Sequence, residues 1–366
     1  MHLLDHKLQQ LLNNQKAIGL ERTLKMPPNG IDFCTNDYLG IIKHNKIALW
    51  LNKNLNTNLN HGNGASRLLG GNSNLLNQAE STIAAFHQAE AALLFSNGYM
   101  ANYALISTLT QKEDIIIYDS LIHASLHAGI KASKATSYSF AHNNLDALAL
   151  KLQTLKTSGT FYIITETVFS MDGDFAPMEQ LVILANLHNA VLIIDEAHAF
   201  GVFGNHGQGF IQQLGLQAQV PIRIYTYGKA AGVHGAAVVG SRVLINYLIN
   251  FCKPLIYSTA MADTQAAAIL AAYNLIPNCN NERLKLLANI NYYKQKFKHA
   301  TPTAIQQIIV PSNEAVIAKA NHLLTKNIGV LPVRYPTVAK GAERIRVVLH
   351  SYNTWDEIDG LYDALQ

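Results

Sequence analysis

Two charged residues follow short apolar runs, at points where buried strands are expected to end. Asp195 closes the aliphatic run of "AVLIIDEAHAFG", and Lys229 follows "IRIYTYG" in a turn made otherwise of glycine and alanine. In open α/β sheets, ligands bind beyond the carboxyl ends of the strands. A carboxylate at the edge of an apolar core costs at least about 1–3 kcal/mol unless a cation or several donors meet it. We therefore expect a positive group opposite Asp195.

A third stretch, "ALLFSNGYMAN", reads as a strand, the turn Asn97-Gly98-Tyr99 and a helix. The first N–H groups of a helix have no partner within the helix, so such a turn is suited to bind an anion. Glycine at position 98 allows the backbone to come close to a phosphate. This stretch is therefore a candidate phosphate site.

Together these features match the needs of pyridoxal 5′-phosphate (PLP). PLP requires a lysine for a Schiff base, an acid facing its pyridine nitrogen, and an anion site for its phosphate. Lys229, Asp195 and the turn at residues 97–99 supply one of each. Any one of them alone would be weak support, because a single lysine on a glycine turn is usually a solvated loop residue.

Other cofactor sites fit the sequence less well. A phosphate-binding P-loop needs a glycine five residues before Gly228 and a Ser or Thr after the lysine, but the chain has Arg223 and Ala230 there. The glycine spacing of a dinucleotide-binding loop is not found, nor is the HExxH motif. The fifteen histidines show no metal-ligand spacing with cysteines, so we expect no metal.

Composition limits the possible partners and compartments. The chain has 366 residues with a net charge of +4, and its lysines and arginines form no block, so a nucleic-acid partner is not expected. Three cysteines far apart suit neither a disulfide framework nor a metal pair, which predicts a reducing, cytoplasmic location. No apolar run reaches the roughly 18 residues that span a bilayer, so no membrane association is expected.

The elements that position these residues alternate along the chain. From about residue 75, short apolar strands such as "DIIIYD", "FYIITET" and "AVLIID" alternate with helix-length segments. This pattern predicts an α/β fold with a mostly parallel central sheet and helices on both faces. Beyond Pro277, "ERIRVVLH" alternates apolar and charged residues as a half-buried strand does. We expect an N-terminal helix and arm at 1–43, a large domain at 44–277 and a small α+β domain at 278–366.

Several segments in order resemble one enzyme family. They are "TNDYLG", "HGNGASRLLGG", "SNGYMAN", "DSLIHASLHAG", "FAHNN", "TETVFSMDGDFAPM", "IIDEAHAFGVFG", "TYGKAAGVHGAA", "LIYSTAM" and "YPTVAKGAERIRVVL". Over residues 31–350 the chain resembles the α-oxoamine synthases, PLP-dependent enzymes of fold type I, and most of all the 8-amino-7-oxononanoate synthases. The resemblance implies an aspartate aminotransferase-like fold and a homodimer with shared active sites. It also implies the decarboxylative condensation of L-alanine with pimeloyl-CoA or pimeloyl-acyl carrier protein in biotin biosynthesis.

The resemblance also implies a role for each matching residue around the cofactor ring. Lys229 would form the Schiff base and remove the Cα proton of L-alanine. Asp195 would face the pyridine nitrogen and His198 the phenolic oxygen. His123 would stack on the ring, with Ser170 on the phenolic side.

Phosphate and substrate residues follow in the same way. Gly98, Tyr99 and Thr226 would bind the phosphate, and Ser258 or Thr259 would reach the phosphate of the neighbouring subunit. Arg346 would hold the substrate carboxylate, and Arg22 and Thr337 would line the acyl-thioester site. Five further residues are interpreted as ordinary surface, core or turn residues without a catalytic role: His142, His188, Asn36, Asp37 and Tyr38.

Two other functions remain open from the sequence. A glycine C-acetyltransferase (2-amino-3-ketobutyrate CoA ligase), or another α-oxoamine synthase, would use the same chemistry on other substrates. A non-catalytic PLP-binding sensor would usually carry a DNA-binding segment, and the sequence shows no basic arm of that kind. The chain departs from the family's usual residues at Leu76, Lys253 and Ala342, where effects on acyl-substrate binding are expected.

Overall fold

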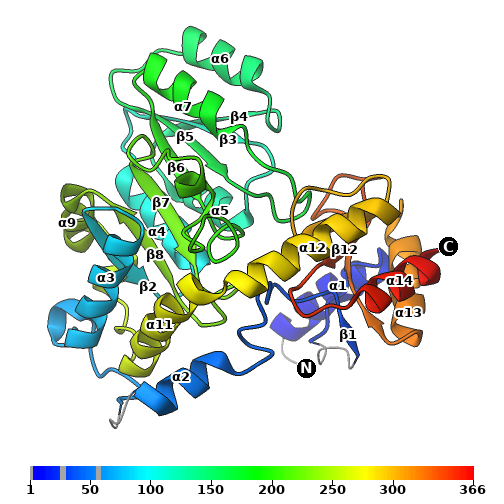
Figure 1. Cartoon of the computed structure of the whole chain (residues 1–366). Helices are drawn as coiled ribbons and strands as arrows, with labels where there is room; N and C mark the ends of the chain where they lie inside the picture. The colour runs from blue at the N-terminus through cyan, green and yellow to red at the C-terminus, as the bar shows by residue number, and fades with distance from the viewer. Residues whose placement is uncertain (1–2, 25–29, 55–58) are drawn as a thin grey trace. The chain divides into compact units, whose positions relative to one another are not determined.

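The computed structural model describes residues 3–24, 30–54 and 59–366 of the chain (Figure 1). Contacts divide it into a large unit, residues 36–288 and 350–352, and a small unit formed by residues 1–35, 289–349 and 353–366. Residues 1–35 group with the C-terminal part because Ile31–Asp32 (β1) pairs in parallel with Ile328–Gly329 (β10). The division into domains at 1–43, 44–277 and 278–366 remains a prediction, since these units are defined by contacts within the chain.

The large unit is built on a seven-stranded sheet with the order β2-β8-β7-β6-β5-β3-β4. Among these strands, β8 alone runs in the direction opposite to the other six. The prediction of a mostly parallel α/β sheet is therefore confirmed. The strands are Ala91–Phe95 (β2), Ile115–Asp119 (β3), Thr136–Phe140 (β4), Phe161–Glu166 (β5), Val191–Asp195 (β6), Ile222–Thr226 (β7) and Ala236–Gly240 (β8).

Helices cover both faces of this sheet (Figure 1). Successive residues of a strand point to opposite faces, so Leu93 and Phe95 of β2 pack with α4, α5 and α9, whereas Leu94 packs with α3 and α11. The face that α3 and α11 cover near β2 is covered by α6, α7 and α8 near β3, β5 and β6. The long aliphatic runs of the sequence are thus strands buried on both faces. The helices are Lys46–Asn54 (α2), Asn74–Phe86 (α3), Gly98–Leu109 (α4), Ala124–Ala132 (α5), Leu145–Thr154 (α6), Met178–Leu187 (α7), Phe210–Gln213 (α8), Arg242–Phe251 (α9), Lys253–Ile256 (α10) and Asp263–Leu275 (α11), with short 3-10 turns at Arg67–Leu69 (η1) and Ile276–Asn278 (η2).

Strand pairing brings polar strand ends to one edge of the sheet. The last residues of β5 and β6, Glu166 and Asp195, are direct partners in the parallel ladder. Asp195 also pairs with Ile224 of β7, two residues before Thr226. Because parallel strands run in the same direction, all three ends and the loops that follow them meet at this edge.

The small unit contains the antiparallel sheet β11-β12-β9 and the β1-β10 pair. Its strands are Ile305–Ile309 (β9), Leu331–Val333 (β11) and Arg344–Val348 (β12), and its helices are Leu3–Ala17 (α1), Asn313–Thr325 (α13), Trp355–Leu365 (α14) and the C-terminal part of Asn280–Lys296 (α12). The prediction that β12 is half-buried is wrong, because all five of its residues are buried. Arg344 and Arg346 are therefore buried cations.

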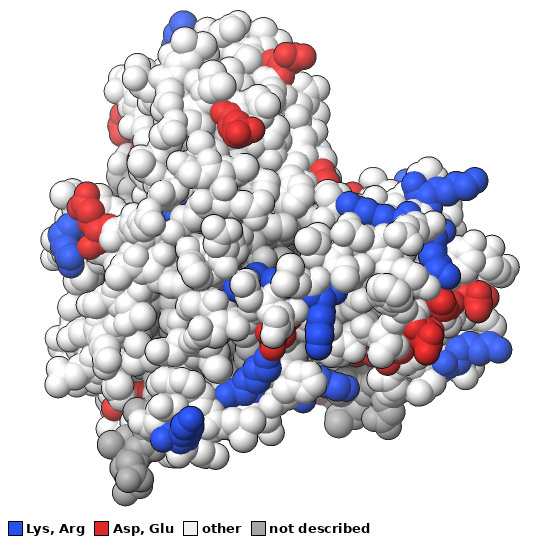
Figure 2. All heavy atoms as spheres, in the orientation of Figure 1, with Lys and Arg blue, Asp and Glu red and all other residues white. Residues whose placement is uncertain are grey.

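Charged side chains are sparse on the face of the molecule drawn in Figure 2, where most of the surface is uncharged. This agrees with a charged fraction of 14% in the sequence. Among residues 3–24, 30–54 and 59–366, no helix has both the length and the apolar character needed to cross a membrane.

Candidate active site

A cavity of about 240 Å³ lies at the edge of the sheet where β5, β6 and β7 end. All of its lining residues belong to the large unit. They are Asn36, Asn97, Gly98, Tyr99, Asn102, His123, Ser125, Glu166, Asp195, Ala197, His198, Thr226, Gly228, Lys229, His234 and Gly235.

Seven of the residues singled out from the sequence line this one cavity: Gly98, Tyr99, His123, Asp195, His198, Thr226 and Lys229. Ser170 lies outside the lining, in the loop between β5 and α7. Ser258 and Thr259 are exposed and line a second cavity, described below. Arg22, Thr337 and Arg346 belong to the small unit, where Arg346 is buried and the other two are exposed.

Both carboxylate oxygens of Asp195 are hydrogen-bonded. Asp195 is only 3% exposed. Its Oδ1 accepts from the backbone N–H of Ala197 at 2.8 Å, and its Oδ2 accepts from Asn102 Nδ2 at 2.7 Å. Asn102 lies one helical turn after Gly98 in α4, so the helix that follows the glycine turn also fixes the orientation of the carboxylate.

A chain of hydrogen bonds joins Asp195 to His123. The second N–H of Asn102 Nδ2 donates to Ser125 Oγ at 2.9 Å, and Ser125 Oγ lies 2.7 Å from His123 Nδ1. The backbone N–H of Ser125 also donates to Nδ1, at 3.2 Å. Nδ1 is thus an acceptor, and the ring proton belongs on Nε2.

The charge state of His123 follows from its surroundings. Burial lowers the pKa of His123 below its usual value; the Asp195 charge opposes this effect, and Lys229 adds to it. A lowered pKa agrees with the acceptor role of Nδ1, because a neutral ring has one acceptor nitrogen. His123 is therefore a neutral ring at neutral pH.

His198 is held by a residue that the sequence analysis had assigned to a simple turn. The hydroxyl of Tyr38 lies 2.6 Å from His198 Nδ1, and both side chains are buried. The Tyr38 hydroxyl also donates to Asn36 Oδ1, at 3.3 Å. The interpretation of Tyr38 as a turn residue alone is thus incomplete, because Tyr38 positions the ring of His198.

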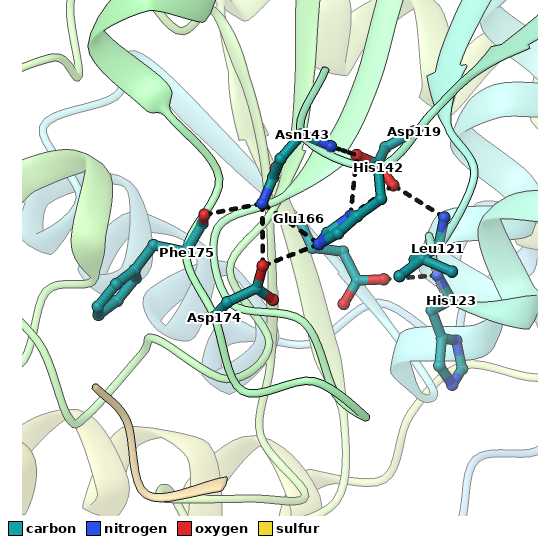
Figure 3. Close-up of polar contacts among 8 residues, drawn as sticks. All are labelled: Asp119, Leu121, His123, His142, Asn143, Glu166, Asp174 and Phe175. Carbon is teal, nitrogen blue, oxygen red and sulfur yellow. Dashed lines mark hydrogen bonds and ion pairs between the residues drawn. The ribbon is translucent and has the colours of Figure 1, made fainter. Parts of the chain in front are cut away.

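Glu166 is a second buried carboxylate beside Asp195. Its Oε1 accepts a hydrogen bond from the backbone N–H of His123 (Figure 3). Burial raises the pKa of Glu166 well above its usual range, and the Asp195 charge adds to this, against the backbone hydrogen bond and the charge of Lys229. Glu166 thus fixes the backbone at the start of α5, from which His123 projects.

The turn before α4 lies directly against the end of β7. A Cβ atom added to Gly98 would lie 2.4 Å from Thr226 Cγ2. Asn97 caps the helix by accepting from the N–H of Met100. Thr226 Oγ1 in turn accepts from Lys229 Nζ at 3.3 Å. A helix N-terminus, a hydroxyl and an amine therefore converge on one side of the cavity, which suits an anion.

Comparison with known proteins identifies the family. Residues 28–365 match the aminotransferase class I and II family. The 8-amino-7-oxononanoate synthase of Bordetella petrii is 39% identical, over 91% of this chain and 87% of that protein. The chain belongs to the 8-amino-7-oxononanoate synthase family, within aminotransferase class I and II. The resemblance inferred from the motifs is thus confirmed.

Solved structures agree with this family. The crystal structure of 8-amino-7-oxononanoate synthase from Francisella tularensis is 30% identical, with a TM-score of 0.76, over 92% of this chain and 96% of that one. A serine palmitoyltransferase structure with PLP is 25% identical, with a TM-score of 0.89, over 100% of this chain and 97% of that one. The predicted PLP-dependent, aminotransferase-like fold is therefore confirmed.

A second cavity, of about 180 Å³, is lined by residues of β2, α10 and the segment that follows α10. It contains Leu76, one of the positions at which the chain departs from the family's usual residues. Thr259 forms an isolated bridge with Ser66 near this cavity. The lining residues are Arg67, Leu76, Leu94, Phe95, Ser96, Met100, Pro254, Leu255, Ser258, Thr259, Ala260, Met261 and Gln265.

Sequence reasoning missed five polar residues of the main cavity: Asn36, which was interpreted as a turn residue, and Asn102, Ser125, Glu166 and His234. Glu166 carried the same signal as Asp195, since it also closes an apolar run. Asn102 could have been noticed because it follows Gly98 by four residues, one turn along the predicted helix. Ser125 and His234 gave no signal beyond their nearness to His123 and Lys229.

Proposed function

We propose that this chain condenses L-alanine with a pimeloyl thioester, with loss of CO2 and release of the free thiol, to give 8-amino-7-oxononanoate for biotin biosynthesis. The observation that carries the proposal is the meeting of Asp195, Lys229, His123 and the α4 N-terminus in one cavity. The relative from Bordetella petrii, which bears the name of this activity, supports it over most of the chain. Pimeloyl-CoA and pimeloyl-acyl carrier protein are both suitable donors.

The cavity fits PLP as its cofactor. The N-terminus of α4, whose Gly98 packs closely against Thr226, would receive the phosphate together with the Tyr99 N–H. Asp195 would face the ring nitrogen, His198 the phenolic oxygen and His123 the ring face. Lys229 Nζ would hold the aldehyde carbon. When bound, PLP supplies an electron sink for the negative charge that develops at the substrate Cα.

The side chains of the cavity would then move and hold protons at defined atoms. Lys229 Nζ would take the proton from Cα of L-alanine and return it after decarboxylation. The Asp195 carboxylate would keep the ring nitrogen protonated, and the Asn102 amide fixes its orientation. His123 would exclude water from the open face. Ser170 would act on the phenolic side, as the resemblance implies.

The substrate-binding residues are proposals that rest on the family resemblance. Arg346 would hold the substrate carboxylate, because a guanidinium binds carboxylates in a bidentate manner. Arg22 and Thr337 would line the site of the acyl thioester. A cytoplasmic location is proposed because all three cysteines, Cys34, Cys252 and Cys279, are free.

A homodimer with shared active sites is part of the proposal. Four large apolar side chains are exposed on elements around α10: Leu68, Leu69, Tyr99 and Tyr257. Both η1, which carries the two leucines, and α4, which carries Tyr99, pack against α10. An exposed apolar patch of this kind typically marks a protein interface. Ser258 and Thr259 lie next to it in sequence and would reach the phosphate of the neighbouring subunit.

Replacement of the cavity lysine tests the proposed chemistry. We expect Lys229→Ala to lower thiol release from pimeloyl-CoA and L-alanine by about 10²–10⁴-fold or more, because the proton acceptor at Cα is lost. The far-UV circular dichroism and melting temperature should stay close to those of the wild type. Lys112→Ala, in an exposed turn, is the matched control and should keep full activity.

The same assay separates the rival functions. Release of CoA from acetyl-CoA with glycine, but not from pimeloyl-CoA with L-alanine, would indicate a glycine C-acetyltransferase. A wild-type protein that binds PLP and releases no thiol with any pair would be a sensor module. Near-normal turnover by Lys229→Ala would overturn the assignment of Lys229.

A further inference from the structure

His142 lies outside the cavity, yet both of its ring nitrogens contact carboxylates. It follows β4 and lies between Asp119, the last residue of β3, and Asp174, in the loop after β5 (Figure 3). Nδ1 is 3.0 Å from Asp119 Oδ1, and Nε2 is 2.8 Å from Asp174 Oδ2. An imidazole donates from both nitrogens only when it is protonated. The ring therefore bridges the two carboxylates as a cation.

The electrostatics agree with this geometry. Burial alone would lower the pKa of His142, but the hydrogen bonds and charges of Asp119 and Asp174 raise it to about 10. The Phe169 and His142 rings pack in a T-shaped arrangement, with ring centroids 4.3 Å apart. His142 is thus an imidazolium throughout the neutral pH range.

Asp119 connects this cation to the loop that carries His123. The Oδ1 atom of Asp119 accepts from the backbone N–H of Leu121 at 2.8 Å (Figure 3). Its Oδ2 atom accepts from the backbone N–H of Asn143 at 2.8 Å. Asp119 itself is fully buried. Any shift of this carboxylate would therefore move the short segment from Leu121 to His123.

Asp174 connects the same cation to the loop that carries Ser170. Asn143 Nδ2 donates to Asp174 Oδ2 and to the carbonyl oxygen of Phe175, both at 3.0 Å (Figure 3). The loop closes on itself through the N–H of Gly173, which donates to the carbonyl of Phe169 at 2.9 Å. Ser170 lies within this closed turn, so the place of Asp174 determines the place of Ser170.

We propose that His142 is a positioning residue that joins the two cofactor-facing loops, residues 120–123 and 167–176, by bridging Asp119 and Asp174. The joining of the loops stands on the contacts above. Its consequence for the cofactor rests on the proposed function, in which His123 and Ser170 face PLP. A neutral side chain at position 142 leaves the buried Asp119 without its cation.

The variant His142→Gln tests the proposal by two measurements on the full chain. Amide hydrogen exchange, read by mass spectrometry, should become about tenfold faster or more in both loops, while the β6 strand at 191–195 keeps its rate. The dissociation constant of PLP, from a spectroscopic titration, should rise by about tenfold to a hundredfold.

Three controls distinguish positioning from general destabilisation. His206→Gln, at an exposed turn, should change neither quantity. Ile83→Ala, in the buried face of α3, destabilises a core cluster that contains no residue of either loop. It should affect stability more than PLP affinity. Asp174→Asn removes one carboxylate only, and should loosen 167–176 while 120–123 stays protected.

Unchanged exchange in both loops of His142→Gln, or the same pattern in Ile83→Ala, would overturn the proposal. If His142→Gln does not fold, Asp174→Asn is used in its place. Amide exchange in 167–176 that is no faster than in the wild type, or that rises equally in 120–123, would then contradict the proposal. The exchange experiment uses no substrate. A wild-type protein without condensation activity would therefore refute the proposed function and leave the joining of the loops unaffected.

Discussion

At the scale of single residues, hydrogen bonds orient His123 and His198 in the cavity, and at His123 they also fix which ring nitrogen carries the proton. Ser125 places the His123 proton on Nε2, and Tyr38 contacts His198 at the corresponding Nδ1 atom. The His123 ring can therefore offer an N–H at Nε2. These hydrogen bonds hold each ring in one orientation. Hydrogen bonds from neighbouring residues orient the histidines of metal sites in the same way.

The residue-scale prediction concerns stability and pH. The pKa of His142 is raised from 6.5 to about 10 in the folded chain. The protonated form is thus favoured by folding, and its contribution to stability is complete below 6.5 and is lost as pH rises through about 10. We expect the difference in free energy of unfolding between wild type and His142→Gln to shrink between pH 7 and pH values above about 10.

Urea unfolding at several pH values measures this difference. The comparison with the variant is needed because buried tyrosines such as Tyr225, whose pKa burial also raises, destabilise both proteins at high pH. The charged groups that face His142 among the described residues are Asp119 and Asp174. A difference that stays constant up to pH 11 would contradict the imidazolium assignment.

At the scale of elements, the turn between β2 and α4 is the most constrained part of the cavity. Helix α4 begins at Gly98, and its first turn lies against Thr226 at the end of β7. The same helix supplies Asn102 to Asp195. A displacement of α4 would therefore change both the anion site and the carboxylate.

The element-scale prediction is that Gly98→Ala displaces this turn. The new Cβ would lie 2.4 Å from Thr226 Cγ2, so we expect a loss of stability of about 1–3 kcal/mol and weaker PLP binding. Thermal unfolding and a PLP titration measure the two effects. Thr226→Ser removes Cγ2 and keeps the hydroxyl, so the double variant Gly98→Ala/Thr226→Ser should recover most of both losses. Absence of recovery would show that the clash is not the cause.

At the scale of the whole molecule, the polar chemistry lies in the large unit, whose sheet is buried on both faces, and the substrate arginine proposed from the resemblance lies in the small unit. The apolar patch formed by Leu68, Leu69, Tyr99 and Tyr257 remains exposed in the single chain. The proposed homodimer would cover this patch.

The whole-molecule prediction is a mass of twice 40.2 kDa by sedimentation at micromolar concentration. Leu69→Glu places a charge on the patch, so we expect it to shift the protein toward the monomer and to lower activity at least about tenfold. Leu187→Glu, on the exposed face of α7, is the matched control and should remain dimeric. A wild-type monomer with full activity would contradict the shared-site proposal.

Much of the site could be predicted because strand ends are visible in the sequence. Asp195, Lys229 and Gly98 stand at the ends of apolar runs, and all three line one cavity. Glu166 ended such a run as well and was overlooked. The strand β12 was misjudged because alternation of arginine with apolar residues normally means one wet face, whereas here the arginines are buried.

The sequence by itself determined the α/β fold class, the family and the residues that suit PLP, because buried parallel strands must be apolar and their carboxyl ends must share one edge. Only the tertiary structure decided how those residues are held. The partners Asn102 and Asp195 lie 93 residues apart, and His142 and Asp174 lie 32 apart. Such contacts depend on which strands become neighbours, and the spacing of residues along the chain does not specify that order.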